Sequence, residues 1–514
     1  MRSVNELTID APLAQRGAFF SRFRTLDFAL FTVLALCLVR LWFMSLPTSF
    51  WVDEMGTVFV VQHGASAPSL RAAPQVAASV YYSLPWLASH LFGTSEISYR
   101  LSSVLAMGAA LFVIGALAAR LIHPGMRWLV IFGCLVLREF NYQASDARPY
   151  ALGTLTLSLT LLCLIRWLDS GRLRDGFLFA ALGSLLWWVH LLFWPFYIVF
   201  AIYAVFRIAT SRTASTWLQA LAMFCLMAVA ALPVALTALN ILHEASSHVV
   251  VPRPSWSDLT SQLKWHTIAG VCAVVAFLNR YAQWDVTRNL AAPASMLLIA
   301  AWWLVDPLAI YAFSTLSGNS VFVGRYMYLA IPGVVLVFSL CVAFFVPERL
   351  WKRMALALGI GVLVFGGHWT RLWPLHQNSN WRDAAMALRQ WTGNQEVPVI
   401  TPSPFIEARP PVWRPGEPAT GFLYSNLAVY PAGGHAYAFP FESSTEAENY
   451  ARTLTDDTLQ HAGRFAIYGG DSNVRFWRQW FAARPEFDQW QNTTLGKWGD
   501  VQIDVFCAPG QPCR

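Results

Sequence analysis

Residues 28–46, FALFTVLALCLVRLWFMSL, form 19 residues of almost uninterrupted apolar sequence, about the length that an α-helix needs to cross a bilayer. The next ten, PTSFWVDEMG at 47–56, place two adjacent acids, Asp53 and Glu54, just past this predicted span. Arginines precede the apolar run and no A-x-A cleavage site follows it. The stretch therefore predicts an uncleaved signal anchor with its N-terminus in the cytoplasm and a carboxylate pair at the edge of the membrane.

The composition extends this reading to the whole chain. Of the 514 residues, 56% are hydrophobic and 13% charged, against about 25% charged in a typical soluble protein. Residues 1–370 hold 24 Lys and Arg against 15 Asp and Glu, whereas residues 371–514 hold 12 against 14. The basic excess thus belongs to the apolar part of the chain. The basic residues form no polar run interleaved with aromatic residues, as nucleic-acid binding would require. We interpret the charge as membrane topology and expect no nucleic-acid partner.

Apolar runs near 20 residues predict about eleven transmembrane helices, at 28–46, 101–122, 128–140, 150–168, 177–190, 192–207, 217–240, 265–279, 292–314, 327–346 and 353–370. The short loops on one side are basic, and the positive-inside rule assigns them to the cytoplasm together with residues 1–27. The loop 49–100 and the tail after 370 are then extracytoplasmic. Within that loop, residues 65–92 are apolar but interrupted by prolines, which favours helices lying along the interface.

The tail, residues 371–514, has the composition of a soluble domain. Helical patterns (WRDAAMALRQW, STEAENYARTL, VRFWRQWFAA) alternate in it with strand patterns (VPVIT, RFAIYGG, VQIDVF), which predicts a small extracytoplasmic α/β domain after the membrane domain 28–370. Cys507 and Cys513 lie close together in this tail, where an oxidising compartment allows them to form a disulfide. The other six cysteines stand singly in apolar segments and are expected to behave as small hydrophobic residues.

The unusual polar residues gather at the extracytoplasmic ends of the predicted spans. Each has an ordinary explanation when taken alone: a carboxylate can solvate a loop, an arginine can anchor a helix end, and a histidine can sit in a core. Ionisable groups at membrane depth are nevertheless costly and usually line a cavity or pair with one another. Their convergence on one side predicts a site, with candidates Asp53, Glu54, Arg100, Asp146, Arg148, Tyr150, His190, Arg325 and Tyr326.

The order of these motifs is specific. LVRLWFMSLPTSFWVDEMGT, LPWLASHLFGTSEISYRLSSVLAMGA, NYQASDARPYAL, VHLLFWPF and VFVGRYMYLAIPG, followed by NWRDAAMAL, resemble the GT-C superfamily of membrane glycosyltransferases. The similarity is to the bacterial branch of glycosyltransferase family 39, which includes protein O-mannosyltransferases and the aminoarabinose transferase acting on lipid A. One departure is that Asp146 stands where the bacterial pattern usually has Glu, so the carboxylate is one methylene shorter.

The resemblance implies transfer of a sugar from a polyprenyl phosphate to an extracytoplasmic hydroxyl, with inversion, at the bacterial inner membrane with the active site facing the periplasm. The acceptor would be a lipid, a polysaccharide or a protein. Such an attack requires one carboxylate as general base, and Asp53 is our choice. Glu54 would hold the acceptor or tune the pKa of Asp53, and Asp146 would orient Arg148 or bind sugar hydroxyls.

The departing phosphate needs charge neutralisation more than a proton, which suits arginine. Arg325 with Tyr326 and Arg148 are the candidates for this contact, with Arg100 as a third, and Tyr150 and His190 are expected to bind the substrate.

A divalent metal ion is a further possibility, with ligands offered by His243, Glu244 and His248 in HEASSH, although their spacing is not that of a helical zinc protease. Two alternatives remain open. One is a polymerase or ligase of lipid-linked oligosaccharides, and the other is a transporter or flippase, although the halves of the chain show no repeat of the kind common in transporters.

Overall fold

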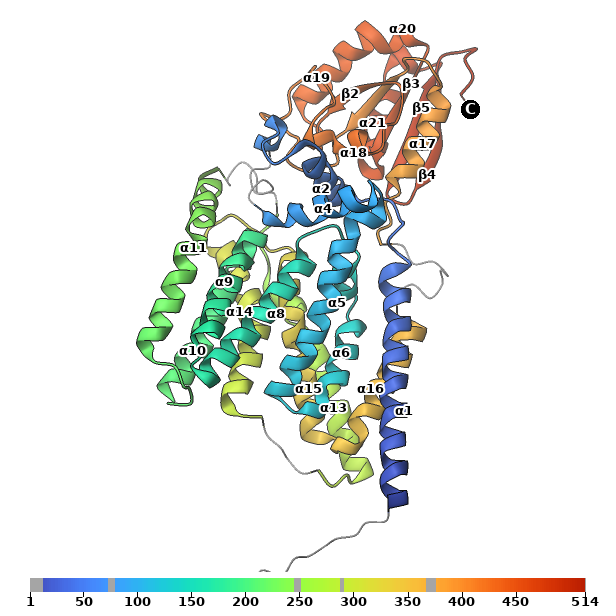
Figure 1. The fold of residues 1–514 in the computed structure, drawn as a ribbon. Coiled ribbons are helices and arrows are strands. Elements are labelled where there is room, and N and C mark those ends of the chain that lie inside the picture. The colour runs from blue at the N-terminus through green and yellow to red at the C-terminus, as the bar shows by residue number, and fades with distance from the viewer. Residues whose placement is uncertain (1–12, 73–78, 245–250, 287–290, 367–375, 514) are drawn as a thin grey trace, which may run out of the picture.

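The computed structural model describes residues 13–72, 79–244, 251–286, 291–366 and 376–513. A large helical bundle forms one end of the molecule and a small unit built around a β-sheet forms the other (Figure 1). The bundle contains α1 (Leu13–Leu38) with its π-helical end (Val39–Phe43), α5 (Glu96–Leu121), α6 (Arg127–Val136), α7 (Arg138–Ala144), α8 (Tyr150–Ser170), α9 (Leu173–Val189), α10 (Pro195–Ala209), α11 (Trp217–Glu244), α12 (Trp256–Leu263), α13 (Trp265–Ala282), α14 (Pro293–Leu316), the 3-10 helix η7 (Gly324–Ala330), α15 (Ile331–Phe345) and α16 (Glu348–Phe365).

All eleven predicted spans overlap helices, but fewer than eleven have the length and composition of a membrane span. Among the described residues seven helices qualify, or eight if the bent pair α12–α13 forms one span. The predicted spans at 128–140, 177–190 and 353–370 overlap helices that do not meet these criteria. Helices α6 and α9 are only 10 and 17 residues long, and α16 begins with the charged sequence ERLWKR.

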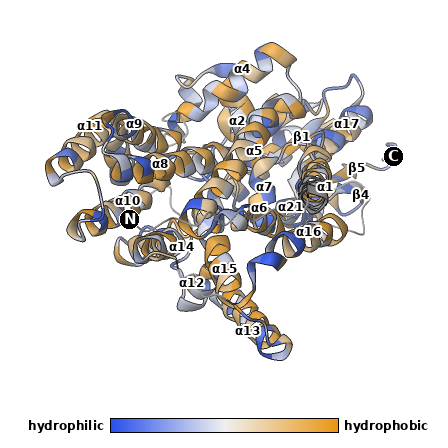
Figure 2. Cartoon of the chain, turned by 60° about the horizontal axis from the view of Figure 1, so that its bottom comes forward, coloured by the Kyte–Doolittle hydropathy of each residue, from blue (hydrophilic) through white to orange (hydrophobic). Residues whose placement is uncertain are grey.

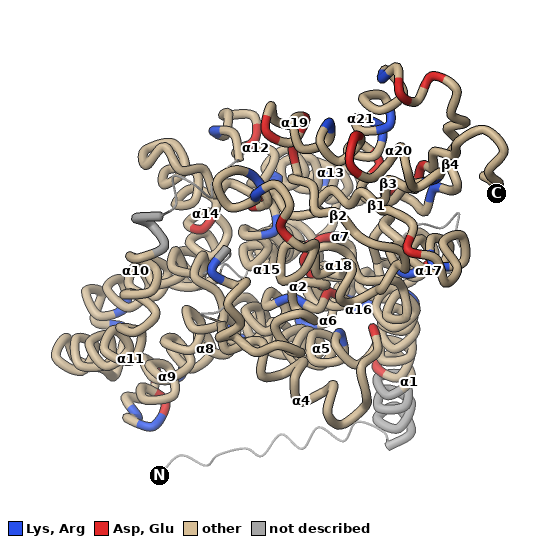
Figure 3. The backbone as a smooth tube through the Cα atoms, turned by 90° about the horizontal axis from the view of Figure 1, so that it is seen from above, with Lys and Arg blue, Asp and Glu red and all other residues tan. Residues whose placement is uncertain are grey.

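The outer surface of the bundle is apolar, as a lipid environment requires. Large hydrophobic side chains are exposed on it, including Leu218, Val229 and Phe277 at 76%, 68% and 67%, and hydrophobic residues predominate along the helices in Figure 2. Long stretches of the helices carry no acidic or basic residue (Figure 3). These features define a polytopic helical membrane protein.

Short helices lie between the bundle and the sheet (Figure 1). They are α2 (Val52–His63), the 3-10 helices Pro68–Ala72 and Val80–Tyr82, and α4 (Ser83–Phe92). On α4 the side chains of Trp86, Leu91 and Phe92 are exposed, the pattern expected of a helix lying at a membrane surface. Residues 73–78 of the predicted interfacial segment lie outside the described residues.

The C-terminal unit is a mixed α/β fold with strand order β2-β1-β3-β5-β4. Strand β1 pairs in parallel with β2 and β3, and β5 pairs antiparallel with β3 and β4. Alternating side chains of β3 enter two different cores, one shared with α17 and the other with α19 and α21. The elements are α17 (Trp381–Thr392), β1 (Pro398–Pro402), α18 (Ser425–Val429), β2 (His435–Phe439), α19 (Thr445–Leu454), β3 (Arg464–Gly470), α21 (Asp471–Ala482), β4 (Gln491–Trp498) and β5 (Val501–Cys507).

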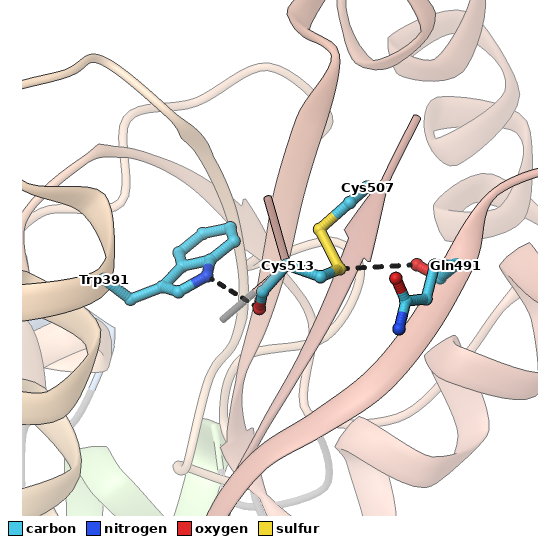
Figure 4. The surroundings of a disulfide bond; sticks show 4 residues. All are labelled: Trp391, Gln491, Cys507 and Cys513. Atoms are coloured by element: carbon cyan, nitrogen blue, oxygen red, sulfur yellow. Dashed lines mark hydrogen bonds between the residues drawn. A yellow bond between two sulfur atoms is a disulfide. The ribbon is translucent and has the colours of Figure 1, made fainter. Parts of the chain in front are cut away.

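The cysteines differ in part from the sequence-based expectation. Cys507 and Cys513, the pair expected to bond, are joined by a disulfide, and the Trp391 indole donates a hydrogen bond to the Cys513 carbonyl oxygen at 3.2 Å (Figure 4). Cys272 and Cys341 were predicted to be lone hydrophobic residues, but a second disulfide joins them. The prediction for this pair is therefore wrong, because the packing of α13 against α15 brings together two cysteines that are 69 residues apart in the sequence.

Candidate active site

The carboxylate pair lies in the first turn of α2, directly after the loop that leaves the first span. Trp51 is the N-cap of this helix in an extended conformation, and its backbone N–H donates to Glu54 Oε2 at 3.3 Å. Carboxylates in the first turn of a helix are favoured by the unpaired N–H groups and the helix dipole. Adjacent residues on a helix point about 100° apart, so Asp53 and Glu54 enter different surroundings.

Glu54 forms a buried ion pair with Arg100 of α5. The guanidinium donates from Nε to Oε1 at 2.7 Å and from Nη2 to Oε2 at 2.5 Å, and neither side chain has exposed surface. Arg100 also donates to the carbonyl oxygens of Leu46 and Thr48 at 2.7 Å, and the Ala147 N–H donates to Glu54 at 2.8 Å. Burial raises the pKa of Glu54, but Arg100 and these hydrogen bonds outweigh burial and hold it below the usual value.

Arg100 was a candidate for the donor phosphate and Glu54 for contact with the acceptor, and this geometry argues against both contacts. The two side chains are completely buried and already paired with each other, so neither presents a free group to a substrate. The other role predicted for Glu54, tuning Asp53, stays a prediction. The pair instead anchors the loop at residues 46–49 to α5.

Asp146 is buried in the same region. Its Oδ1 accepts a hydrogen bond from the Trp51 indole at 2.9 Å and lies 3.3 Å from His376 Nε2, and the residue has no exposed surface. Burial raises the pKa of the Asp146 carboxyl, while His376 opposes the rise. The side chain was expected to orient Arg148 or to bind sugar hydroxyls. The contacts with Trp51 and His376 occupy Oδ1, whereas Oδ2 has no hydrogen-bond partner among the described residues, so both roles stay predictions.

Asp53 is the accessible carboxylate of the pair, with 19% of its side chain exposed. Arg325 Nη1 of η7 lies 3.1 Å from Asp53 Oδ2, and Arg148 Nη2 lies 3.7 Å from the same oxygen. Arg148 also donates to the Asp53 carbonyl oxygen at 3.2 Å. Segments around residues 53, 148 and 325 therefore bring one carboxylate and two guanidinium groups together, as the sequence analysis expected.

Aromatic side chains form one wall of this cluster. The His190 ring lies 5.7 Å from that of Tyr150 and 5.6 Å from that of Tyr326 between ring centroids, and the Arg325 guanidinium lies 5.4 Å from the Tyr326 ring. His190 Nδ1 accepts from the Leu192 N–H at 3.2 Å, which leaves Nε2 as the ring's donor atom. All the predicted substrate-binding residues except Arg100 thus surround Asp53.

Several buried polar atoms here have no hydrogen-bond partner within the described part of the chain. They include Asp53 Oδ2, Asp146 Oδ2, Arg148 Nε, Arg325 Nε and Tyr150 Oη. Buried polar groups are normally hydrogen-bonded, so a concentration of unsatisfied atoms on one cluster is the arrangement expected where a polar ligand binds.

Sequence reasoning missed two contributors, Trp51 and His376. The signal for Trp51 was its place beside the acidic pair. His376 is a lone histidine just before the tail, and nothing in the sequence indicated that it would reach Asp146, because the two are 230 residues apart. The Tyr142 ring stacks on the His376 ring with centroids 4.3 Å apart, which fixes the imidazole in place.

Metal-binding side chains also occur together here, but their surroundings do not suit an ion. Ligand atoms of Glu54, Asp146 and His376 lie within 4.8 Å of one another. Both Glu54 oxygens already accept from Arg100, and Asp146 Oδ1 accepts from Trp51, so a cation would have to displace these donors beside a buried guanidinium. The alternative ligands His243, Glu244 and His248 lie outside the side chains that the structure describes.

Together, the apolar helical bundle and the small C-terminal α/β unit define a polytopic helical membrane protein with a C-terminal domain, and this part of the predicted fold class is confirmed. Comparisons with protein-family models and with curated proteins give no match.

Two solved structures are similar over nearly the whole chain. One is ArnT from Cupriavidus metallidurans in the apo state, with 11% identity and a TM-score of 0.54, covering 95% of this chain and 98% of that one. The other is the same protein bound to undecaprenyl phosphate, with 11% identity and a TM-score of 0.54, covering 92% and 97%. At this level of identity the similarity confirms the predicted resemblance for the fold alone.

Proposed function

We propose that this chain is a membrane glycosyltransferase that moves a sugar from a polyprenyl phosphate to a hydroxyl group outside the cytoplasm, with inversion at the anomeric carbon. The observation that carries the proposal is Asp53, an accessible carboxylate beside Arg325 and Arg148. Transfer from a glycosyl phosphate requires one base and a cationic phosphate site. The ArnT structure bound to undecaprenyl phosphate supports a donor on a polyprenyl carrier.

On the acceptor side, Asp53 takes the proton of the attacking hydroxyl. As the acceptor oxygen forms its bond to the anomeric carbon, the bond from that carbon to the phosphate oxygen breaks and its electron pair leaves with the polyprenyl phosphate. The proton passes to the Asp53 carboxylate, whose side chain is 19% exposed. General base catalysis of this kind contributes about 10²- to 10⁴-fold to the rate.

On the donor side, Arg325 and Arg148 neutralise the phosphate. Their side chains are 33% and 14% exposed, so both are partly open to a ligand, unlike Arg100. The two guanidinium groups lie against Asp53. A phosphate bound to them would compete with the carboxylate and leave Asp53 a better base. Tyr150, Tyr326 and His190 would then contact the sugar or the phosphate.

The site and the C-terminal unit belong to the same side of the membrane. Arg382 of α17 donates to the Pro47 carbonyl oxygen at 3.2 Å and pairs with Glu96 Oε1 at 2.9 Å. Since the opposite loops are basic, we propose that this side is the periplasm of a bacterial inner membrane and that the chain divides into a cytoplasmic segment 1–27, a membrane domain 28–370 and a periplasmic domain 371–514. A reporter fused after residue 514 tests the orientation, and a cytoplasmic signal contradicts it.

The proposal is tested by incubating the purified protein with a panel of undecaprenyl-phosphate sugars and with lipid A, an oligosaccharide and a serine-containing peptide as acceptors. We expect consumption of at least one donor, release of undecaprenyl phosphate and a product of inverted anomeric configuration by NMR. The matched control is Glu442→Gln, a change at an exposed carboxylate of the C-terminal unit, which should behave as wild type. A folded protein that consumes none of the donors contradicts the proposal.

A further inference from the structure

The Arg325 guanidinium lies over two aromatic rings, one from its own 3-10 helix and one from the N-cap of α2. Its central carbon, Cζ, is 5.4 Å from the centre of the Tyr326 ring and 5.8 Å from the centre of the Trp51 ring. A guanidinium within about 6 Å of an aromatic face is attracted by the ring, and most strongly by an indole. Trp51 thus provides a second contact with Arg325 from this end of α2, besides the ion pair with Asp53.

This aromatic contact matters because Arg325 has few polar ones. Its Nη1 lies 3.1 Å from Asp53 Oδ2, and its Nε has no hydrogen-bond partner within the described part of the chain. Arg148, by contrast, also donates to the Asp53 carbonyl oxygen at 3.2 Å. A phosphate that competes with the Asp53 carboxylate would loosen the ion pair of Arg325. The rings would then remain as the contacts that hold this flexible side chain in one orientation.

Trp51 is fixed at both its backbone and its side chain. The backbone N–H donates to Glu54 Oε2 at 3.3 Å, and the indole N–H donates to Asp146 Oδ1 at 2.9 Å. Rotating the indole away from Arg325 would break the hydrogen bond to Asp146, a residue with no exposed surface, and buried polar groups are normally hydrogen-bonded. The position of the ring is therefore set by the fold.

Asp146 is held in turn by the segment that leads into the C-terminal unit. His376 Nε2 lies 3.3 Å from Asp146 Oδ1. The Tyr142 ring stacks on the imidazole with centroids 4.3 Å apart, and the Gln377 side-chain amide donates to the Tyr142 hydroxyl. These contacts connect residues 376–377 to the indole that Asp146 holds.

We propose that Trp51 is a positioning residue of the donor site: its indole ring, fixed by Asp146, holds the Arg325 guanidinium in place for the phosphate of the donor. This assignment rests on the proposed function. The Asp53 carboxylate cannot have this role, because it competes with the phosphate for the same cation. An aromatic face carries no net charge, so it orients the guanidinium without such competition. An indole also has an N–H that can be anchored while its face stays on the cation.

The test separates these two properties of the indole. Trp51→Phe keeps a ring and loses the N–H, Trp51→Gln keeps an N–H for Asp146 and loses the ring, and Trp51→Leu loses both. Each variant is made in the wild type and in the Arg325→Ala background, and the Kd for undecaprenyl phosphate is measured in lipid nanodiscs. Trp217→Leu is the control, because this tryptophan at the start of α11 is 56% exposed and its replacement should leave the Kd unchanged.

With Arg325 in place, we expect the Kd to rise about threefold to tenfold in Trp51→Gln and Trp51→Leu, and less in Trp51→Phe. In the Arg325→Ala background the same changes should alter the Kd by less than about twofold, because the guanidinium through which Trp51 acts is absent. If Trp51→Leu does not fold, Trp51→Gln carries the test, since its amide can still donate to Asp146.

The outcomes separate this assignment from the proposed function. A weaker affinity in Arg325→Ala, together with an unchanged Kd in Trp51→Gln and Trp51→Leu, overturns the role of Trp51 and leaves the proposed function standing. An equal loss of affinity in both backgrounds also overturns it, because Trp51 would then contact the lipid itself or support the fold. If Arg325→Ala binds undecaprenyl phosphate as tightly as the wild type, the phosphate site of the proposed function is contradicted, and the role of Trp51 fails with it.

Discussion

Replacing Glu54 with glutamine removes the carboxylate that pairs with Arg100 inside the protein. The guanidinium would stay in place, because it also donates to the carbonyl oxygens of Leu46 and Thr48 at 2.7 Å and of Ser49 at 3.1 Å. Arg100 would therefore remain charged with no exposed surface, and the glutamine amide would present a donor toward another donor. Removing one partner of a buried ion pair costs about 3–5 kcal/mol of folding free energy.

The free energy of unfolding can be measured on purified protein in micelles by denaturant titration with tryptophan fluorescence. Asp471→Asn is the control, because its ion pair with Lys497 is partly exposed and should cost about 1 kcal/mol or less. The double variant Glu54→Leu with Arg100→Met should recover most of the lost stability, since it leaves no unpaired charge. A Glu54→Gln variant within about 1 kcal/mol of wild type would refute the reasoning.

The same ion pair predicts how stability depends on pH. The folded protein holds the pKa of Glu54 below the usual value, which is about 4.3 in an unfolded chain. The pair therefore contributes its full stability above that value and loses it as the pH falls through the lower folded-state pKa. The double variant should lack this part of the acid dependence.

Three further predictions concern the donor site, the tail and the loop before Asp53. Arg325→Ala should weaken undecaprenyl phosphate binding about tenfold or more, because a charge-assisted contact contributes about 1.5–3 kcal/mol. Arg325→Lys should restore only part of this binding. Equal Kd values in the wild type and both variants would remove Arg325 from the phosphate site. Cys507 and Cys513 should resist alkylation until a reductant is added, and labelling of both without reductant would contradict the disulfide. Arg382→Ala removes the hydrogen bond from α17 to the loop before Asp53. It should lower kcat about twofold to tenfold without changing undecaprenyl phosphate binding. An unchanged kcat would show that the contact does not position the base.

Much of the architecture follows from patterns that act locally. Apolar runs near 20 residues indicate the membrane helices, and the alternation in RFAIYGG predicts β3 at its exact bounds. The sequence patterns predicted no strand at β2 or β4. Strand β4, at the edge of the sheet, is mostly polar and partly exposed, so it lacks the hydrophobic signal that marks a buried strand.

The site could be predicted only as a group of residues. Asp53 and Glu54 are adjacent acids of similar chemistry, and the sequence does not show which one turns into the protein. That is decided by α5, which presents Arg100 to one of them. The pairing of Asp146 with His376 likewise depends on a contact across 230 residues. Such long-range pairings leave no local periodicity, so residue type alone did not indicate that Glu54 pairs with Arg100 or that Asp146 contacts His376.

The most direct test of the central claim is the turnover of Asp53→Asn. The substitution keeps the size of the side chain and removes its capacity as a base, beside Arg325 at 3.1 Å and Arg148 at 3.7 Å. Initial rates of sugar transfer and undecaprenyl phosphate binding are measured on the same folded preparation. We predict a fall in kcat of about 10²-fold or more with binding retained. Sugar transfer by Asp53→Asn at close to the wild-type rate would contradict the assignment of Asp53 as the general base.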